Sequence, residues 1–312
     1  MSGTDKTGRR RSGHDEGMDV NVSVIPAFLA THARVLDRRR YDLLMGDGDA
    51  SSALAALEGY RNPDGGYGWG LEPDLRAPES QPGAALHAFE VFKDIAPVTA
   101  PQAAALCDWL ESVTLPDGGL PFALPISYPD GTAPWWAGDD HTTSSLQITA
   151  VSAAIAHRVA AHDPAVAAHP WLARATRYCL DAIQALDERP QAYELSFAVR
   201  FLDAVHDGQP RAAGLLKRLA DYLPADGRVP VEGGTEEESL RPLDFAPEPG
   251  RPARELFAPE VIAADLARLA GEQQDDGGWV VDYARISPGG TLDWRGAATL
   301  RAVEILRANG LI

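Results

Sequence analysis

Apolar residues recur every three or four positions along most of this chain, which is the spacing of one face of an α-helix. The clearest case is residues 142–161, where Ile148, Val151, Ile155 and Val159 share one side. The same spacing predicts further helices at 24–37, 51–60, 81–96, 100–110, 171–186, 193–205, 212–222, 257–271 and 292–309. Almost no stretch alternates between apolar and polar residues as a strand does. The sequence therefore predicts an all-α fold.

A turn signal recurs between these helices. Asp-Gly-Gly occurs at 64–66, 117–119 and 276–278, and a weaker copy is Asp226-Gly227. Glycine adopts positive φ at little cost, so the phrase predicts a tight turn. The copies are 53 residues apart between Asp64 and Asp117 and 50 apart between Asp226 and Asp276. A period of this size is typical of stacked helical hairpins, and five to six fit the length, in an open solenoid or a closed toroid.

One copy carries a longer motif. Residues 273–279 read Gln-x-x-x-Gly-Gly-Trp, and residues 294–302 read Trp-x-x-x-x-Thr-Leu-x-Ala. These phrases, together with residues 80–86, resemble the Gln-Trp repeat of squalene-hopene cyclases and the helix that follows it. The same superfamily contains class II diterpene cyclases and protein prenyltransferase β-subunits. The resemblance covers about residues 57–312, with Arg61 in place of Gln in the first copy and Leu120 in place of Trp in the second. It implies an α/α toroid.

We therefore expect one all-α domain at residues 21–312, an α/α toroid of five to six helical hairpins. Residues 1–20 are polar and rich in Gly, Ser, Asp and Arg, which predicts a disordered tail. The Pro-rich stretch 230–252 lacks periodicity and is expected to form a loop or a flap over the mouth of the toroid.

The net charge of the chain argues against certain partners, and its cysteines indicate the compartment. The 312 residues carry a formal net charge of −17, which argues against nucleic acid or an anionic membrane surface as a partner. The two cysteines, Cys107 and Cys179, lie in apolar runs and are expected to be buried thiols in a reducing compartment. No secretory segment or apolar span of about 18 residues is evident, so we expect a cytoplasmic protein with no integral membrane segment.

The first candidate for chemistry is the stretch 135–142, Trp-Trp-Ala-Gly-Asp-Asp-His-Thr. It resembles the Asp-x-Asp-Asp-Thr phrase of class II terpene cyclases, with Ala137 in place of the first Asp and His141 before Thr142. The resemblance implies that Asp139 is the acid that protonates an alkene or epoxide, and that Asp140 is its partner. The alternative is that both carboxylates only cap the following helix. With His141 they could also hold a ligand or a cation.

Protonating an alkene requires a neutral carboxylic acid, kept so by burial and a nearby like charge. The resulting carbocation is stabilised by aromatic faces, as in cation–π sites. The aromatic residues near the candidate acid in this interpretation are Tyr67, Trp69, Phe122, Trp135 and Trp136. Trp279 and Trp294 are instead expected to anchor the last hairpin.

Glu72 and Asp74 are the second candidate, in a Pro-containing loop that also holds Arg76. Paired with Asp139, such carboxylates could serve a glycosidase, because α/α toroids host carbohydrate-active enzymes as well. The alternative is that both carboxylates are merely solvated, with Arg76 paired to one of them.

No paired-Cys or His-Glu-x-x-His metal motif occurs, and no phosphate-binding loop is evident. We therefore expect no metal site and no cofactor, except Mg²⁺ if the substrate is a diphosphate. A diphosphate would need cations near the cavity, for which the candidates are 38–40, a run of three arginines, and Arg61. Such a basic run is more often the solvated end of a helix.

The leading hypothesis is a terpenoid-cyclase-like enzyme that cyclises a small isoprenoid substrate in an apolar, aromatic-lined cavity. The alternatives are a non-catalytic module that binds a hydrophobic ligand or a peptide, and a carbohydrate-active toroid. The oligomeric state is left open.

Overall fold

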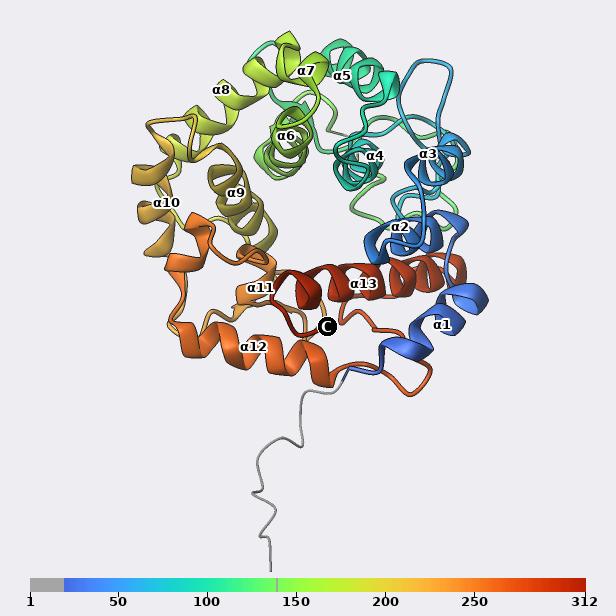
Figure 1. Cartoon of the computed structure of the whole chain (residues 1–312). Coiled ribbons are helices and arrows are strands. Elements are labelled where there is room, and N and C mark those ends of the chain that lie inside the picture. The colour runs from blue at the N-terminus through green and yellow to red at the C-terminus, as the bar shows by residue number, and fades with distance from the viewer. Residues whose placement is uncertain (1–19, 139) are drawn as a thin grey trace, which may run out of the picture.

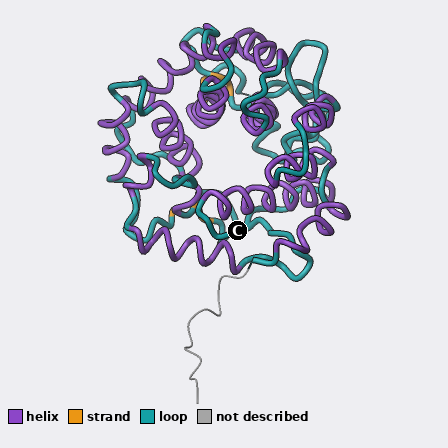
Figure 2. The backbone as a smooth tube through the Cα atoms, viewed as in Figure 1, coloured by secondary structure: helices purple, strands orange, loops and turns teal. Residues whose placement is uncertain are grey.

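The computed structural model describes residues 20–138 and 140–312 (Figure 1). The predicted tail therefore lies outside the described residues, apart from Val20. The described chain is all-α, as predicted, and Figure 2 shows mainly helix and loop. The described residues form four strands of two residues each. The helices are α1 (Ile25–His32), α2 (Val35–Met45), α3 (Ala50–Glu58), α4 (Pro82–Asp94), α5 (Pro101–Val113), α6 (Leu146–Ala160), α7 (Pro164–Ala167), α8 (Pro170–Ala185), α9 (Ala192–Val205), α10 (Ala212–Ala220), α11 (Pro242–Phe245), α12 (Pro259–Gly271) and α13 (Pro288–Ala308).

Short 3₁₀ helices cover Val22–Val24 and Pro252–Leu256. Strand β1 (Leu120–Pro121) pairs antiparallel with β2 (Ser144–Ser145), and β3 (Val229–Pro230) with β4 (Ser239–Leu240). These pairs tie the two ends of long loops together next to α6 and α11. They add no sheet layer to the fold.

The helices follow one another around a ring in two layers (Figure 1). The inner layer contains α2, α4, α6, α9, α11 and α13, and the outer layer contains α1, α3, α5, α8, α10 and α12. The large buried cluster of apolar side chains runs between the layers from α2 to α12, and a second cluster joins α1, α2 and α13. Because α13 contacts both α1 and α2, the last hairpin lies against the first.

The Asp-Gly-Gly turns explain how one hairpin packs on the next. In the first turn, Asp64 Oδ1 accepts the Gly66 N–H at 2.9 Å and the hydroxyl of Ser80, just before α4, at 2.8 Å. Gly65 has φ +92°, which an L side chain rarely adopts. A Cβ on Gly66 would lie 2.6 Å from the Trp109 ring of α5. Glycine is needed here because the turn touches the next outer helix.

The other two complete turns repeat this geometry. Asp117 accepts the N–H of Gly119 at 3.1 Å and the Ser144 hydroxyl at 2.6 Å. In the last turn Asp276 pairs with Arg295, and a Cβ on Gly278 would lie 2.5 Å from a Phe28 ring atom. Phe28 belongs to α1, so the last turn packs against the first outer helix. Each turn therefore contacts the next outer helix around the ring.

Two predictions on buried residues are confirmed. Trp279 is buried, and its indole N–H donates to the Leu269 carbonyl at 2.7 Å, as expected for a residue that locks a hairpin. Cys107 and Cys179 are free, buried thiols. In the basic run, Arg40 is buried rather than solvated, in an ion pair of 2.7 Å with Asp94.

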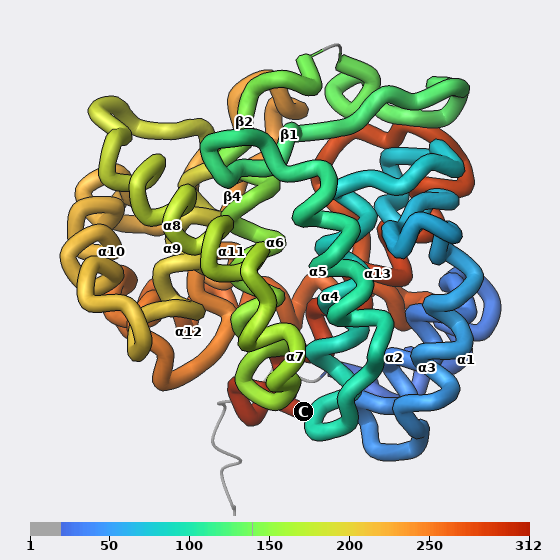
Figure 3. Tube along the Cα trace, turned by 90° about the horizontal axis from the view of Figure 1, so that it is seen from above, coloured from blue at the N-terminus to red at the C-terminus, as the bar shows by residue number. Residues whose placement is uncertain are grey.

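The long loops lie at one end of the ring (Figure 3). Four connections from outer to inner helices are long, at 59–81, 114–145, 221–241 and 272–287, and we call this end of the ring its loop end. The inner helices α4, α6, α9 and α13 all begin there. Side chains near their N-termini therefore surround the loop end, and later residues lie deeper in the ring.

Candidate functional site

Glu72 and Asp74 are buried, although they lie in a loop between α3 and α4. Neighbouring loops hold the segment in place: the Asp74 carbonyl accepts the Ala133 N–H at 2.8 Å, and the Arg76 N–H donates to the Thr132 hydroxyl at 3.0 Å. Glu72 Oε1 accepts the Asp74 N–H at 3.0 Å. The expectation that these carboxylates are simply solvated is wrong, because the loop is packed between α13 and residues 129–136.

His87 of α4 joins Glu72 to a charged network. Its Nε2 lies 2.9 Å from Glu72 Oε2, and its Nδ1 lies 3.1 Å from Glu90 Oε2. Burial alone would lower the His87 pKa, but Glu90 and Glu72 raise it to about 9. With a carboxylate at each ring nitrogen, His87 is an imidazolium at neutral pH. Glu90 continues the network to Arg40 of α2 at 3.2 Å.

The environment of Asp74 disfavours the charged form of its carboxyl group. Burial and the neighbouring Glu72 carboxylate raise its pKa to about 6, against the lowering effect of Trp294 and Arg76. Glu72 has hydrogen-bond partners on both oxygens, so of the two carboxyls Asp74 is the one placed to carry a proton. A group with a pKa near 6 can donate and recover a proton near neutral pH. Arg76 is itself ion-paired with Asp293.

Aromatic side chains lie beside Asp74. Trp294 of α13 is edge-on to Tyr283 at 5.1 Å between ring centroids and edge-on to His87 at 6.2 Å. The indole N–H of Trp294 is close enough to Asp74 to lower its pKa, yet it is buried without a standard hydrogen bond to any described residue. Burial, followed by the charge of Glu72, raises the Tyr283 pKa well above its ordinary value, so that hydroxyl stays protonated.

Residues of the stretch 230–252 complete the loop end. The Tyr193 hydroxyl, at the start of α9, donates to Glu238 Oε1 at 2.8 Å. The Thr235 hydroxyl donates to the carbonyl of Asp282 at 2.9 Å, next to Tyr283. The segment predicted as a loop or flap contains β4 and α11 and connects the Tyr193 side of the ring to the Tyr283 side.

Asp139 lies outside the described residues. Asp140 is exposed, and its Oδ1 accepts the N–H groups of Thr142 at 2.9 Å and Thr143 at 3.1 Å. Hydrogen bonds from Thr143 and Thr142 lower the Asp140 pKa to about 2. A carboxylate this acidic stays ionised and suits the turn before α6. His141 places Nδ1 3.0 Å from the Ala123 carbonyl.

The predicted aromatic residues are split among different environments. Phe122 and Trp136 stack with centroids 4.6 Å apart, and Trp136 also lies against Gly83 at the start of α4. Tyr67 is fully buried, edge-on to Phe92. Trp69 and Trp135 are largely exposed, and the Trp69 indole N–H donates to the Asn62 side chain at 2.8 Å. The structure thus brings Phe122 and Trp136 together and places Tyr67 in the core.

Sequence reasoning missed His87, Tyr283 and the role of Trp294 beside Asp74. One signal was present, because His87 and Glu90 are polar residues three apart in the otherwise apolar segment 82–92. Nothing local indicated Tyr283, which lies in an irregular loop far along the chain. Trp294 has the spacing of a core residue, and only the fold places it beside Asp74.

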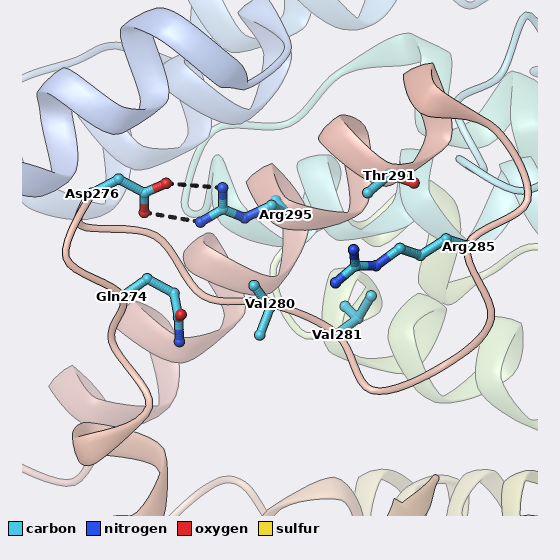
Figure 4. Close-up of a pocket in the computed structure, with 7 residues that line it drawn as sticks. All are labelled: Gln274, Asp276, Val280, Val281, Arg285, Thr291 and Arg295. Carbon is cyan, nitrogen blue, oxygen red and sulfur yellow. Dashed lines mark hydrogen bonds and ion pairs between the residues drawn. The ribbon is translucent and has the colours of Figure 1, made fainter. Parts of the chain in front are cut away.

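A separate cavity of about 240 Å³ lies between the loop after Trp279 and α13 (Figure 4). Val280 and Thr291 contribute to its lining, and Arg295 spans it to form two hydrogen bonds of 2.9 Å with Asp276. Asp276 and Arg295 match each other's charge, and Arg285 also lines this cavity. No carboxyl group with a raised pKa is among its described lining residues, so it offers weaker acid chemistry than the Asp74 environment.

Among residues 20–138 and 140–312, no group of three or more His, Cys, Asp or Glu side chains is arranged to hold a metal ion. No helix in this described part is both long and apolar enough to span a bilayer.

Comparison with known proteins adds no relative. The chain matches no protein-family model, and no curated protein matches it. The site must therefore be interpreted from its own geometry.

Proposed function

We propose that this protein is an isoprenoid cyclase with an α/α-toroid fold, in which Asp74 is the proton donor. The repeated Asp-Gly-Gly turns, the two layers of helices and the contact of α13 with α1 and α2 support the toroid. The observation that carries the function is the buried Asp74 carboxyl, with a pKa of about 6, beside Trp294 and Tyr283.

In this mechanism the Asp74 O–H gives its proton to one carbon of an alkene. The π electrons form the new C–H bond, and the other carbon becomes a carbocation. The π systems of Trp294 and Tyr283 stabilise this cation. A second alkene of the same chain attacks it and closes a ring, and loss of a proton ends the sequence. The proton returned to solvent or base balances the one that Asp74 regains.

Glu72 and His87 prepare Asp74 for this role. His87 and the Asp74 N–H fix the position of the Glu72 carboxylate, and the charge of Glu72 disfavours ionisation of Asp74. Glu72 therefore acts on Asp74 through its charge, while the proton for the reaction is carried by Asp74.

The glycosidase alternative has one observation in its favour: an acid with a pKa near 6 suits protonation of a glycosidic oxygen. Such enzymes also need a second carboxylate across the scissile bond, about 5–9.5 Å away. Glu72 cannot meet this need, because it lies on the same loop as Asp74 and both of its oxygens are engaged. We therefore rank this function second.

The test is incubation of the purified protein with geranyl, farnesyl and geranylgeranyl diphosphate and with squalene, with and without Mg²⁺, followed by product analysis by gas chromatography and mass spectrometry. Asp74→Asn and Asp139→Asn run beside the wild type. Cyclised product that is lost in Asp74→Asn and retained in Asp139→Asn supports the proposal.

Loss in Asp139→Asn with retention in Asp74→Asn assigns the acid to Asp139 and contradicts our assignment. The absence of product from every isoprenoid contradicts the cyclase itself. Hydrolysis of chromogenic glycosides in the same experiment would move the conclusion to the second candidate, and inactivity on all substrates would favour a binding module.

A further inference from the structure

Arg76 follows Asp74 by two residues in the loop between α3 and α4, and its guanidinium pairs with Asp293 of α13. Asp293 directly precedes Trp294, which lies beside Asp74. A single ion pair therefore joins the loop that carries the acid to the helix that carries its aromatic neighbour. We call this ion pair the clasp and residues 70–76 the acid loop.

Backbone from three segments packs around the Arg76 side chain. A Cβ added to Gly70 would lie 3.3 Å from Arg76 Cζ, and one added to Gly289 would lie 3.3 Å from Nη2. A Cβ added to Gly131 would lie 3.5 Å from Cγ. These glycines belong to the acid loop, to the first turn of α13 and to the long loop before α6. Arg76 is therefore the common neighbour of three segments that are far apart in the sequence.

The first turn of α13 also touches the acid loop directly. A Cβ added to Gly290 would lie 2.8 Å from the Pro73 carbonyl oxygen and 3.6 Å from Asp74 Oδ1. A side chain at this position would displace the loop, so glycine is needed for the close approach. The clasp thus holds together two segments that are already in contact next to the acid.

The other anchors of the acid loop lead to different elements. Arg34, just before α2, donates to the Leu71 carbonyl at 2.9 Å and is paired with Asp37. Thr132 and Ala133 bind the loop from the segment before α6. These contacts fix the loop to the first hairpin and to the neighbouring long loop. The clasp fixes it to the last helix, which closes the ring.

The charge of the clasp also acts on Asp74. Burial and Glu72 raise the pKa of Asp74, while the hydrogen bond from Trp294 and the charge of Arg76 lower it. Because Arg76 and Asp293 have opposite charges, removing either one leaves the other uncompensated near the acid. The other charged and titratable groups around Asp74 and the clasp are Glu72 on the same loop, His87 on α4, Tyr283 before α13, and Arg34 and Tyr60 beside α2 and α3.

We propose that Arg76 and Asp293 are positioning residues, which hold the Asp74 carboxyl against Trp294 by joining the acid loop to α13. Their effect on the reaction is transmitted through Asp74 and Trp294, because catalysis depends on how closely the reacting groups are held. The role in catalysis rests on the proposed function. The effect on the Asp74 carboxyl does not, and it can be measured without a substrate.

The test is a carbon-13 NMR titration of the full-length protein labelled at aspartate Cγ, with the Asp74 signal assigned by its loss in Asp74→Asn. We expect the Asp74 pKa to rise in Arg76→Gln, because a nearby positive charge is removed. It should fall in Asp293→Asn, which leaves the charge of Arg76 uncompensated. Arg76→Lys keeps the charge, so its Asp74 pKa should stay close to that of wild type. A merely structural role would not give shifts of opposite sign.

A second signal reports the position of α13. In wild type the Trp294 indole N–H resonance, assigned with Trp294→Phe, should shift with pH in step with the Asp74 titration, because the two groups adjoin. We expect this pH-dependent shift to become smaller in Arg76→Gln and in Asp293→Asn, because both variants lack the clasp.

Arg174→Gln is the matched control. Arg174 of α8 also pairs with a different helix, through Glu111 of α5 at 2.7 Å, and its side chain is 30% exposed against 32% for Arg76. It binds the Leu115 carbonyl beside the second turn and not the acid loop. Both NMR signals should match wild type in this variant. Circular dichroism checks folding, and Asp293→Asn with Arg76→Lys carries the test if Arg76→Gln does not fold.

An unchanged Asp74 pKa in both Arg76→Gln and Asp293→Asn, or a shift of the same sign in both, overturns the proposal. Shifts of opposite sign without turnover of any isoprenoid leave the clasp standing and contradict the cyclase. Where wild type cyclises an isoprenoid, both variants should lower kcat by up to about 10²-fold with little change in KM. Wild-type turnover in both variants would contradict the positioning role and leave the cyclase intact.

Discussion

Asp74 and Asp140 lie in corresponding parts of two neighbouring hairpins, yet their proton affinities differ by several orders of magnitude. Both follow an Asp-Gly-Gly turn and precede an inner helix, α4 for Asp74 and α6 for Asp140. Asp74 has a pKa of about 6 and Asp140 of about 2. The residue type and the place in the repeat are alike, so the difference comes from the surroundings.

Two physical effects cause the difference in pKa between Asp74 and Asp140. Asp74 is buried beside the negative charge of Glu72, and both effects penalise its ionised form. Asp140 is exposed and accepts hydrogen bonds from Thr142 and Thr143, which favour its ionised form. A carboxyl group with a pKa of about 2, such as Asp140, holds almost no proton to donate at neutral pH. A carboxyl group with a pKa of about 6, such as Asp74, can donate a proton near neutral pH.

The largest effect should come from Asp74→Asn. Loss of the general acid is expected to reduce turnover by about 10²–10⁴-fold. The same change should stabilise the fold at pH 7, by about 1–3 kcal/mol, because a buried charge is removed. Urea unfolding measures the free energy of unfolding, and a variant that is both inactive and less stable at pH 7 would show that Asp74 is structural.

The contribution of Asp74 to the free energy of unfolding should decrease as the pH rises. The pKa of Asp74 in the folded state is raised from 3.8 to about 6. The protonated side chain therefore contributes stability that is fully present below pH 4 and is lost as the pH rises through 6. The stability difference between Asp74→Asn and wild type should therefore grow between pH 4 and 6.

His87→Gln should have the next largest effect. It removes the cation between Glu72 and Glu90, and breaking such a buried pair costs about 3–5 kcal/mol. The folded pKa of His87 is raised to about 9, so its stabilisation is complete below pH 6.5 and is lost as the pH rises through 9. Wild-type unfolding measured at pH 6, 8 and 9.5 should show this decline. A decline of equal size in His87→Gln would refute the assignment.

Glu72→Gln should shift the pH dependence of the enzymatic activity. The variant keeps a side chain of the same shape and removes the charge that helps raise the Asp74 pKa. The limb of the activity profile that reports the acid should therefore move to lower pH. A profile that stays in place would mean that burial alone sets the Asp74 pKa.

Asp140→Asn should have the smallest effect on turnover. The exposed side chain closes a local turn, and an amide oxygen can accept from Thr142 and Thr143 as well. We expect turnover within about twofold of wild type, as for a surface substitution away from the chemistry. A large loss of activity here, with folding intact, would contradict the contrast between the two carboxylates.

Much of the fold could be predicted from local sequence. Helical spacing identified most of the helices, and the Asp-Gly-Gly turns gave the repeat, because glycine at φ +92° and at close contacts is a local requirement. The short helices α7 and α11 were missed because four residues are too few to show a period. The predicted burial of Cys107, Cys179 and Trp279 also followed from the apolar pattern around them.

The site was less predictable. Glu72 and Asp74 were identified as candidates, but their burial depends on contacts with Thr132 and Ala133, more than 50 residues away. Tyr283 and Trp294 carry no local signal of their position, since Trp294 meets His87 only when the last hairpin packs against the first ones.

The sequence by itself determined the helices, the repeat period and the turns, because backbone geometry and apolar spacing act over a few residues. The tertiary structure alone decided which of the two carboxyl groups, Asp74 or Asp140, has a raised pKa. Proton affinity and ion pairing depend on burial and on charges brought together from distant hairpins. In this protein they are set by how α4, α6, α9 and α13 meet inside the ring.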